Sequence, residues 1–239
     1  MPNDFFRFKQ FVVYQDRSAM KVSTDACLLG AWAPFPETTA TILDIGAGTG
    51  LLSLMLAQRF RLAQITAVEL DGEAAGQATQ NVAESPFTDR VQVVCEDIRA
   101  YHPDECFDAI ICNPPFFFNS LKGPSAVRNQ ARHQDALHLS ELAARVQQLL
   151  KPNGCVAVVL PADIHRTWEQ LLSGPDWQLE QAVAIRPLPD KPVNRVLSLY
   201  RKQKSPEAVG FRTEEILYES YGVYTPFAQT LLQPFYLKL

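Results

Sequence analysis

The sequence lacks any pattern that predicts a metal site or a disulfide framework. Its five cysteines include no C-x-x-C pair, and its four histidines are scattered. Structural zinc sites need Cys and His ligands at short, regular spacings, so no metal site is predicted. Three of the cysteines, Cys95, Cys112 and Cys155, lie in apolar runs that predict buried strands. A free cysteine behaves there as a small hydrophobic residue, and we expect structural roles for them.

Long apolar runs are also missing. No stretch approaches the roughly 20 residues needed to span a bilayer. The first four residues, M-P-N-D, lack the basic start and apolar segment of a secretory signal. We therefore expect a cytoplasmic protein without a membrane partner. The 239 residues, of which 47% are hydrophobic and 20% charged, are typical of a single globular domain.

An excess of positive charge is absent as well, because the formal net charge is −4. Nucleic-acid binding depends on a local basic patch and is not excluded by the total. Basic residues gather in three segments: Arg7, Lys9, Arg17 and Lys21; Lys122, Arg128, Arg132 and His133; and Arg195, Arg201, Lys202 and Lys204. The sequence leaves open whether they are ordinary solvated faces or one RNA-binding surface.

The middle of the chain alternates between predicted strands and helices. We expect strands at residues 41–45, 64–70, 90–95, 107–112, 155–160, 179–185 and 196–201, and helices at 25–32, 51–60, 72–83, 138–150 and 162–173. This alternation predicts an α/β fold of the Rossmann-like type, with a mostly parallel, seven-stranded, doubly wound sheet. Ligands of such sheets bind at the carboxyl ends of the strands.

A glycine-rich turn, with Gly46, Gly48 and Gly50, follows the first of these strands. Glycine lets a backbone turn sharply and approach a ligand closely. Such a turn also suits the pyrophosphate of NAD, but the spacing is G-x-G-x-G and not G-x-G-x-x-G. Asp44 at the strand end favours a cationic ligand instead. S-adenosylmethionine carries an ammonium and a sulfonium, and Asp44 is expected near its amino-acid end.

Two further strands of the alternation also end in carboxylates. Glu69 closes the second strand, where it is suited to accept hydrogen bonds from both ribose hydroxyls. Asp97 follows the third strand, where it is suited to accept from the adenine amino group, with Leu70 and Ile98 flanking the adenine faces. An NAD site would leave Asp44 and Asp97 without a role. We therefore predict S-adenosylmethionine as the cofactor.

The segment Asn113-Pro114-Pro115-Phe116 follows the fourth strand. Its prolines stiffen the bend and leave the carbonyl of Pro114 free to accept, beside the side-chain acceptor of Asn113. Together these oxygens are suited to hold both hydrogens of a planar amino group, so that its delocalised lone pair becomes available. Positioning and electrostatics then carry the reaction. Phe116 is expected to stack on a flat substrate.

With these motifs the sequence resembles class I methyltransferases that carry N-P-P-[FY], and most closely the bacterial valine-tRNA adenine-N6 methyltransferase family. The resemblance runs nearly end to end. It includes F-K-Q at 8–10, M-K-V-S-T-D at 20–25, L-L-G-A-W at 28–32, A-R-H at 131–133, Y-T-P at 224–226 and F-Y-L at 235–237. It implies methylation of the exocyclic amino nitrogen of an adenine in tRNA, at nucleotide 37 of valine tRNA.

The resemblance also implies roles for individual residues and segments. Cofactor contacts are implied for Asp44, Gly46, Glu69, Asp97 and Asn113, and substrate contacts for Asn113, Pro114 and Phe116. Lys21, Thr24 and Asp25 match the family's segment that covers the amino-acid end of the cofactor. The motifs described above add Gly48, Gly50, Leu70 and Ile98 to the predicted cofactor site. We expect one methyltransferase domain over residues 1–239. Within it, residues 1–36 form an extension that covers the cofactor, and residues 206–239 form a tail that packs on the domain.

Three alternatives share parts of this pattern. A release-factor-type glutamine methyltransferase uses N-P-P-Y, but residue 116 is phenylalanine and no separate N-terminal helical domain is predicted to grip a protein. Guanine-N2 methyltransferases of ribosomal RNA share N-P-P-F but usually carry a duplicated domain, for which 239 residues are too few. A non-enzymatic cofactor-binding scaffold would not need the intact loop at residues 113–116.

Overall fold

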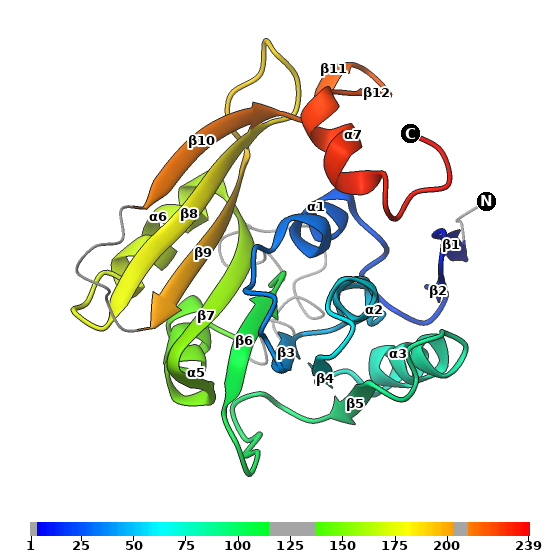
Figure 1. The fold of residues 1–239 in the computed structure, drawn as a ribbon, viewed down its shortest axis with the longest axis vertical. Coiled ribbons are helices and arrows are strands. Elements are labelled where there is room, and N and C mark those ends of the chain that lie inside the picture. The colour runs from blue at the N-terminus through cyan, green and yellow to red at the C-terminus, as the bar shows by residue number, and fades with distance from the viewer. Residues whose placement is uncertain (1–3, 115–136, 203–209) are drawn as a thin grey trace, which may run out of the picture.

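A central eight-stranded sheet organises the chain in the computed structural model, which describes residues 4–114, 137–202 and 210–239 (Figure 1). From one edge to the other the strands run β10 (Phe211–Ile216), β8 (Trp177–Arg186), β9 (Arg195–Lys202), β7 (Leu150–Pro161), β6 (Phe107–Cys112), β3 (Thr41–Ile45), β4 (Gln64–Glu69) and β5 (Val91–Cys95). All neighbouring pairs are parallel except those that β9 makes with β7 and β8. This confirms the mostly parallel α/β fold.

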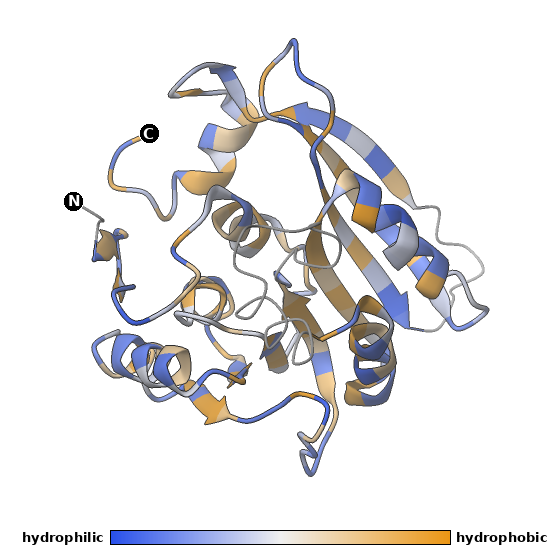
Figure 2. Cartoon of the chain, turned by 180° about the vertical axis from the view of Figure 1, so that it is seen from behind, coloured by the Kyte–Doolittle hydropathy of each residue, from blue (hydrophilic) through white to orange (hydrophobic). Residues whose placement is uncertain are grey.

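Helices cover both faces of the sheet. One face packs against α1 (Thr24–Trp32), α2 (Leu51–Arg59) and α3 (Gly72–Ala83), and the other against α5 (Leu139–Leu149) and α6 (Ala162–Leu171). Successive residues of β6 alternate between the two cores, since Ile111 belongs to the first and Ile110 to the second. Figure 2 accordingly shows the central strands largely in the hydrophobic colour.

The sheet has one more strand than the seven predicted. The eighth, β10, pairs with β8 at the edge, within the segment expected to be a tail. Its sequence F-R-T-E-E-I has an exposed apolar start and charged middle, so it shows no alternation from which a strand is predicted. An edge strand is held by backbone hydrogen bonds on one side, and its side chains need not be apolar.

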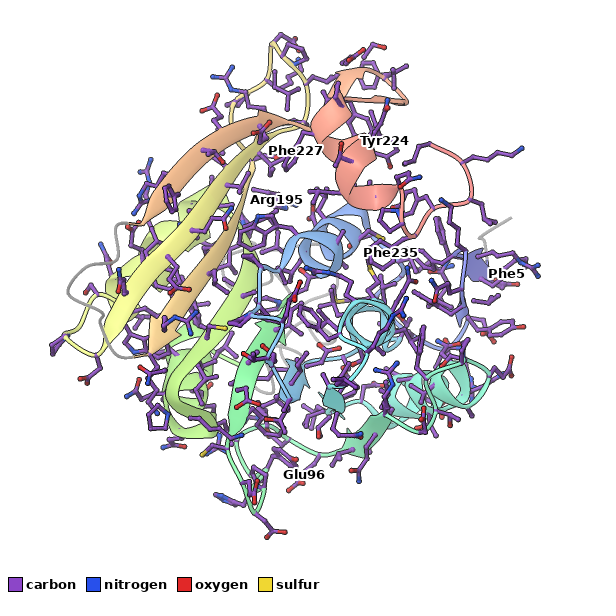
Figure 3. The ribbon with its side chains drawn as sticks, viewed as in Figure 1. Phe5, Glu96, Arg195, Tyr224, Phe227 and Phe235 are labelled. Carbon is purple, nitrogen blue, oxygen red and sulfur yellow. The ribbon has the colours of Figure 1, made fainter. Side chains whose placement is uncertain are left out.

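The two ends of the chain pack against each other. The turn between β1 (Phe5–Arg7) and β2 (Val12–Tyr14) contains Lys9, whose N–H donates to the carbonyl of Phe235 over 2.8 Å. Phe235, labelled in Figure 3, is 1% exposed and follows α7 (Pro226–Leu232). A second short hairpin, β11 (Tyr218–Ser220) with β12 (Val223–Tyr224), precedes α7. The division at residues 36 and 206 stays a prediction.

The burial of the cysteines in strands depends on where each strand lies in the sheet. Cys112 and Cys155 lie in central strands and are buried, as predicted, but Cys95 is exposed, so its predicted burial is wrong. Cys95 ends β5, which is an edge strand with a neighbour on one side only. Among the described residues, no group of three or more His, Cys, Asp or Glu is placed to hold a metal ion. Nor is any helix there long and apolar enough to cross a membrane.

Candidate active site

A cavity of about 240 Å³ opens at the carboxyl ends of β3, β4, β5 and β6. This is the switch point of the sheet, because β4 and β5 continue from β3 to one side while β6 and β7 lie on the other. The cavity is lined by Ser18, Ala19, Met20, Ile45, Gly46, Gly48, Val68, Glu69, Leu70, Asp71, Ala74, Glu96, Asp97, Ile98, Arg99, Cys112, Pro114 and Leu137. Seven of the predicted site residues are among them: Gly46, Gly48, Glu69, Leu70, Asp97, Ile98 and Pro114.

The glycine turn forms the floor between β3 and α2. Gly46, Gly48 and Gly50 have φ values of 71°, 55° and 79°, in the left-handed region that favours glycine. A Cβ at Gly46 would meet no other atom within 4 Å, so packing does not explain the missing side chain there. Gly46 lines the cavity, and its bare backbone leaves that space open to a ligand.

Glu69 connects the ends of two neighbouring strands. One carboxylate oxygen accepts from the N–H of Gly48 over 2.8 Å, and the other accepts from the N–H of Asp71 over 2.9 Å. Asp71 in turn caps α3, because its side chain accepts from the N–H of Ala74. The Glu69 carboxylate is thus fixed in direction at the cavity wall, with further lone pairs available to a ligand.

Asp97 is held by its neighbour Arg99. Its carboxylate accepts from the backbone N–H of Arg99 over 2.8 Å and from the guanidinium Nε over 2.9 Å. These hydrogen bonds from Arg99 lower the pKa of Asp97 below its ordinary value, so the carboxylate is ionised at neutral pH. Ile98 is 7% exposed and Leu70 51% exposed, and both present apolar surface to the same cavity.

Asp44 lies behind the glycine turn and is fully buried. One oxygen accepts from the N–H and the hydroxyl of Ser53 over 3.1 and 2.7 Å, while the other has no partner among the described residues. Burial raises the pKa of Asp44 to about 7, although the bonds from Ser53 lower it. Asp44 is not one of the cavity-lining residues.

Asn113 and Pro114 follow β6 at the same edge. Pro114 and Cys112 line the cavity, whereas Asn113 between them is not one of the lining residues. The side-chain oxygen of Asn113 is buried and has no hydrogen-bond partner within the described part of the chain. Leaving a buried acceptor unpaired costs about 1–3 kcal/mol, which a ligand donor would recover. Phe116 and the basic residues of 122–133 lie outside the described residues.

The N-terminal part of the site differs in detail from the prediction. Lys21 is exposed, and Thr24 begins α1 after its N-cap Ser23; neither is a cavity-lining residue, and nor is Gly50. The chain lines the cavity instead with residues 18–20, none of which was a predicted site residue. No pattern marks these residues, because their position depends on contacts with a helix distant in sequence.

The basic residues that the structure describes are held in separate contacts. Lys9 donates to the carbonyl of Gln233, and Arg17 donates to the side chain of Gln80. Arg195, labelled in Figure 3, lies at the carboxyl end of β7, where it contacts Asp25 of α1 over 2.7 Å. Arg201 lies near the other end of β9 and pairs with Glu180. The described residues of the third segment therefore lie at opposite ends of β9.

Comparison with known proteins identifies the family. Residues 28–173 match the methyltransferase small domain. Curated proteins named tRNA1(Val) (adenine(37)-N6)-methyltransferase from Dyadobacter fermentans and Bacteroides fragilis are each 42% identical to this chain. The first match covers 99% of this chain and 98% of the relative, and the second covers 100% of both. The chain belongs to this methyltransferase family.

Solved structures agree with that family in fold. An O-methyltransferase from Agrobacterium tumefaciens, described as predicted, gives a TM-score of 0.70 at 21% identity, over 88% of this chain and 96% of its own. TYW2 of Pyrococcus horikoshii, solved in complex with MeSAdo, gives a TM-score of 0.59 at 16% identity, over 86% of this chain and 74% of its own. At these identities the similarity concerns the fold alone.

Proposed function

We propose that the chain transfers the methyl group of S-adenosylmethionine to the exocyclic amino nitrogen of adenine 37 in a valine tRNA. The relatives that are 42% identical over nearly the whole chain carry this activity in their names. The structural observation that carries the proposal is the buried, unpartnered side-chain oxygen of Asn113 beside the cavity-lining Pro114. Such an acceptor suits an amino group that enters from the cavity. This function implies a cytoplasmic enzyme.

The cavity has the chemistry that S-adenosylmethionine requires. In this proposal Glu69, which is held by the N–H groups of Gly48 and Asp71, accepts from the ribose hydroxyls, and the ionised Asp97 accepts from the adenine amino group. Leu70 and Ile98 provide apolar surface for the adenine faces, and Gly46 leaves room for close backbone approach. When bound, the cofactor supplies a methyl group made electrophilic by its positive sulfur.

We assign the amino-acid end of the cofactor to Asp44, Lys21 and Thr24, with backbone contributions from the glycine turn. Asp44 has one unpartnered oxygen, as expected for a group that gains a partner on binding. A nearby cation favours the ionised carboxylate and would lower the raised pKa of Asp44. The cofactor's ammonium is such a cation.

Asn113 and Pro114 act on the nucleophile. The Asn113 side-chain oxygen and the Pro114 carbonyl accept the two amino hydrogens, which directs the nitrogen lone pair toward the methyl group. Phe116 stacks on the adenine in this proposal. Neither acceptor is a strong base, and none is needed, because the nitrogen becomes acidic once it carries the methyl group and then releases its proton. The adenine must leave its stack to reach this position.

The alternative substrates are a protein glutamine and guanine in ribosomal RNA. The experiment that separates them incubates the protein and radiolabelled cofactor with total tRNA, ribosomal RNA or cellular protein in separate reactions. We expect label in tRNA, as N6-methyladenine at nucleotide 37 of the valine species. Label found only in protein would overturn the proposed substrate. Cofactor bound without label in any fraction would favour a non-enzymatic scaffold.

A further inference from the structure

Two buried side-chain amides of α3 hold the N-terminal segment at the mouth of the cavity. Gln77 and Asn81 lie on consecutive turns of the helix, and both are 0% exposed. Burying an amide is unfavourable unless its donors and acceptors are paired. Four of the six hydrogen bonds that these amides make go to the backbone of residues 14–18, about 60 positions earlier in the chain.

Asn81 joins the N-terminal segment to the glycine turn. Its oxygen accepts from the N–H of Tyr14 over 2.8 Å, and its amide nitrogen donates to the carbonyl of Tyr14 over 2.9 Å. The same nitrogen donates to the carbonyl of Thr49, also over 2.9 Å. One side chain thus fixes Tyr14 relative to the turn that contains Gly48 and Gly50.

Gln77 holds the residues that enter the cavity. Its oxygen accepts from the N–H groups of Arg17 and Ser18 over 2.8 and 3.1 Å, and its nitrogen donates to the Asp16 carboxylate over 2.8 Å. Ser18 itself lines the cavity, and its hydroxyl donates to the carbonyl of Met20, which also lines it. A Cβ on Gly48 would lie 4.0 Å from the Ser18 hydroxyl, so this segment closes over the glycine turn.

The packing of α3 permits these contacts. The helix comes close to the glycine turn because Gly50 has no side chain, and a Cβ there would lie 3.3 Å from the Cβ of Ala78. Ala78 stands between the two amides in sequence. The first turn of α3 supplies Ala74 to the cavity wall directly, and the later turns act through the N-terminal segment.

We propose that Gln77 and Asn81 are positioning residues for cofactor binding. Their hydrogen bonds hold residues 14–20 over the glycine turn, and the two side chains do not touch the cofactor themselves. This proposal deepens the proposed function and rests on it. Because these hydrogen bonds order the cavity wall before the cofactor binds, their loss makes the free energy of cofactor binding less favourable: the wall must then be ordered on binding. Cofactor affinity, and not the chemical step, is the quantity that depends on the two amides.

The test measures S-adenosylhomocysteine affinity by calorimetry in the full chain. Asn81→Leu and Gln77→Leu each remove three hydrogen bonds, and each is expected to weaken binding roughly tenfold or more. Gln80→Leu is the matched control. It replaces an amide of the same helix that meets the segment only through the Arg17 side chain, and its affinity should stay within about twofold of wild type, below the effect of one hydrogen bond.

Asp16→Ala keeps the Gln77 oxygen as the acceptor for Arg17 and Ser18 and loses only the bond from the Gln77 nitrogen to Asp16. Its affinity should therefore lie between those of wild type and Gln77→Leu. In tRNA methylation the KM for S-adenosylmethionine should rise for the Leu variants. The kcat at saturating cofactor should change by less than about twofold, because the transition-state contacts remain.

Hydrogen exchange of the free protein provides a readout independent of binding. The backbone amides of Tyr14, Arg17 and Ser18 should exchange faster in the Leu variants, while those of the central strands stay protected. Equal affinity and equal exchange in wild type and both Leu variants would overturn the proposed positioning role of Gln77 and Asn81. Failure of the wild-type protein to bind S-adenosylhomocysteine would instead overturn the proposed function, and with it the role of the two amides in cofactor binding. Hydrogen exchange would still report whether the amides hold residues 14–20.

Discussion

The carboxylate of Glu69 accepts a hydrogen bond of 2.8 Å from the backbone N–H of Gly48. The bond links the end of β4 to the turn that follows β3, two segments that meet only because their strands are parallel neighbours. The second oxygen of Glu69 holds Asp71 at the start of α3. A single acidic side chain therefore fixes the glycine turn, presents a lone pair to the cavity and supports the helix that holds the N-terminal segment.

Glu69→Gln should weaken cofactor binding by more than about tenfold. The two oxygens of Glu69 accept from two N–H groups, whereas a glutamine places an NH₂ group against one of these donors. The loss of charge also removes the stronger acceptor for ribose hydroxyls. Calorimetry with S-adenosylhomocysteine measures the effect. Glu73→Gln, an exposed carboxylate in the first turn of α3, is the charge-matched control and should bind as wild type.

Asn113→Ala should lower kcat for tRNA methylation by on the order of 10²–10³ while leaving cofactor binding nearly unchanged. The substitution removes the buried acceptor that we assign to the amino group of the adenine. Single-turnover assays with valine tRNA measure the chemical step, and calorimetry measures cofactor affinity in the same preparation. Full activity in Asn113→Ala would falsify the assigned role.

Methylation of valine tRNA should fall steeply as salt increases. If a few basic side chains contact phosphates, kcat/KM should drop on the order of tenfold or more between about 50 and 200 mM salt. Of the described basic residues, Arg201 pairs with Glu180 away from the cavity, so Arg201→Gln should leave the salt slope unchanged. A flat response of the wild-type enzyme to salt would point to a protein substrate.

Asp44 should make the cofactor-free protein less stable as pH rises from about 4 toward 7. Burial holds the folded-state pKa at about 7, above the ordinary value of 3.8, so the folded state retains a proton that the unfolded state has released. The free energy of unfolding therefore decreases through this window, and the loss is complete above pH 7.

Asp44→Asn provides the comparison for that pH effect, because an asparagine carries no titrating proton. Urea unfolding at pH 5 and pH 8 should show a larger decrease for wild type than for Asp44→Asn, by on the order of a few kcal/mol. Asp104→Asn, which changes an exposed carboxylate, should follow wild type. Parallel curves for wild type and Asp44→Asn would show that Asp44 is ionised in the folded protein across this range.

Local sequence patterns predicted the strands that form the centre of the sheet. The apolar run at residues 107–112 and the turn residues that follow residue 45 depend on neighbours in sequence, so β6 and the glycine turn appear at the expected positions. The edge strand β10 and the exposed end of β5 were not predicted correctly. At an edge, backbone pairing on one side suffices, and apolar side chains are no longer required.

The sequence by itself determined the α/β class, the acidic residues at successive strand ends and the Asn-Pro-Pro-Phe segment. These features follow from periodicity and from the chemistry of short motifs. Only the tertiary structure decided that residues 18–20 line the cavity and that Gln77 and Asn81 hold the segment there. It also decided that Arg195 and Arg201 lie at opposite ends of β9. Such contacts join residues tens of positions apart, and the direction of each side chain is fixed only when the elements pack.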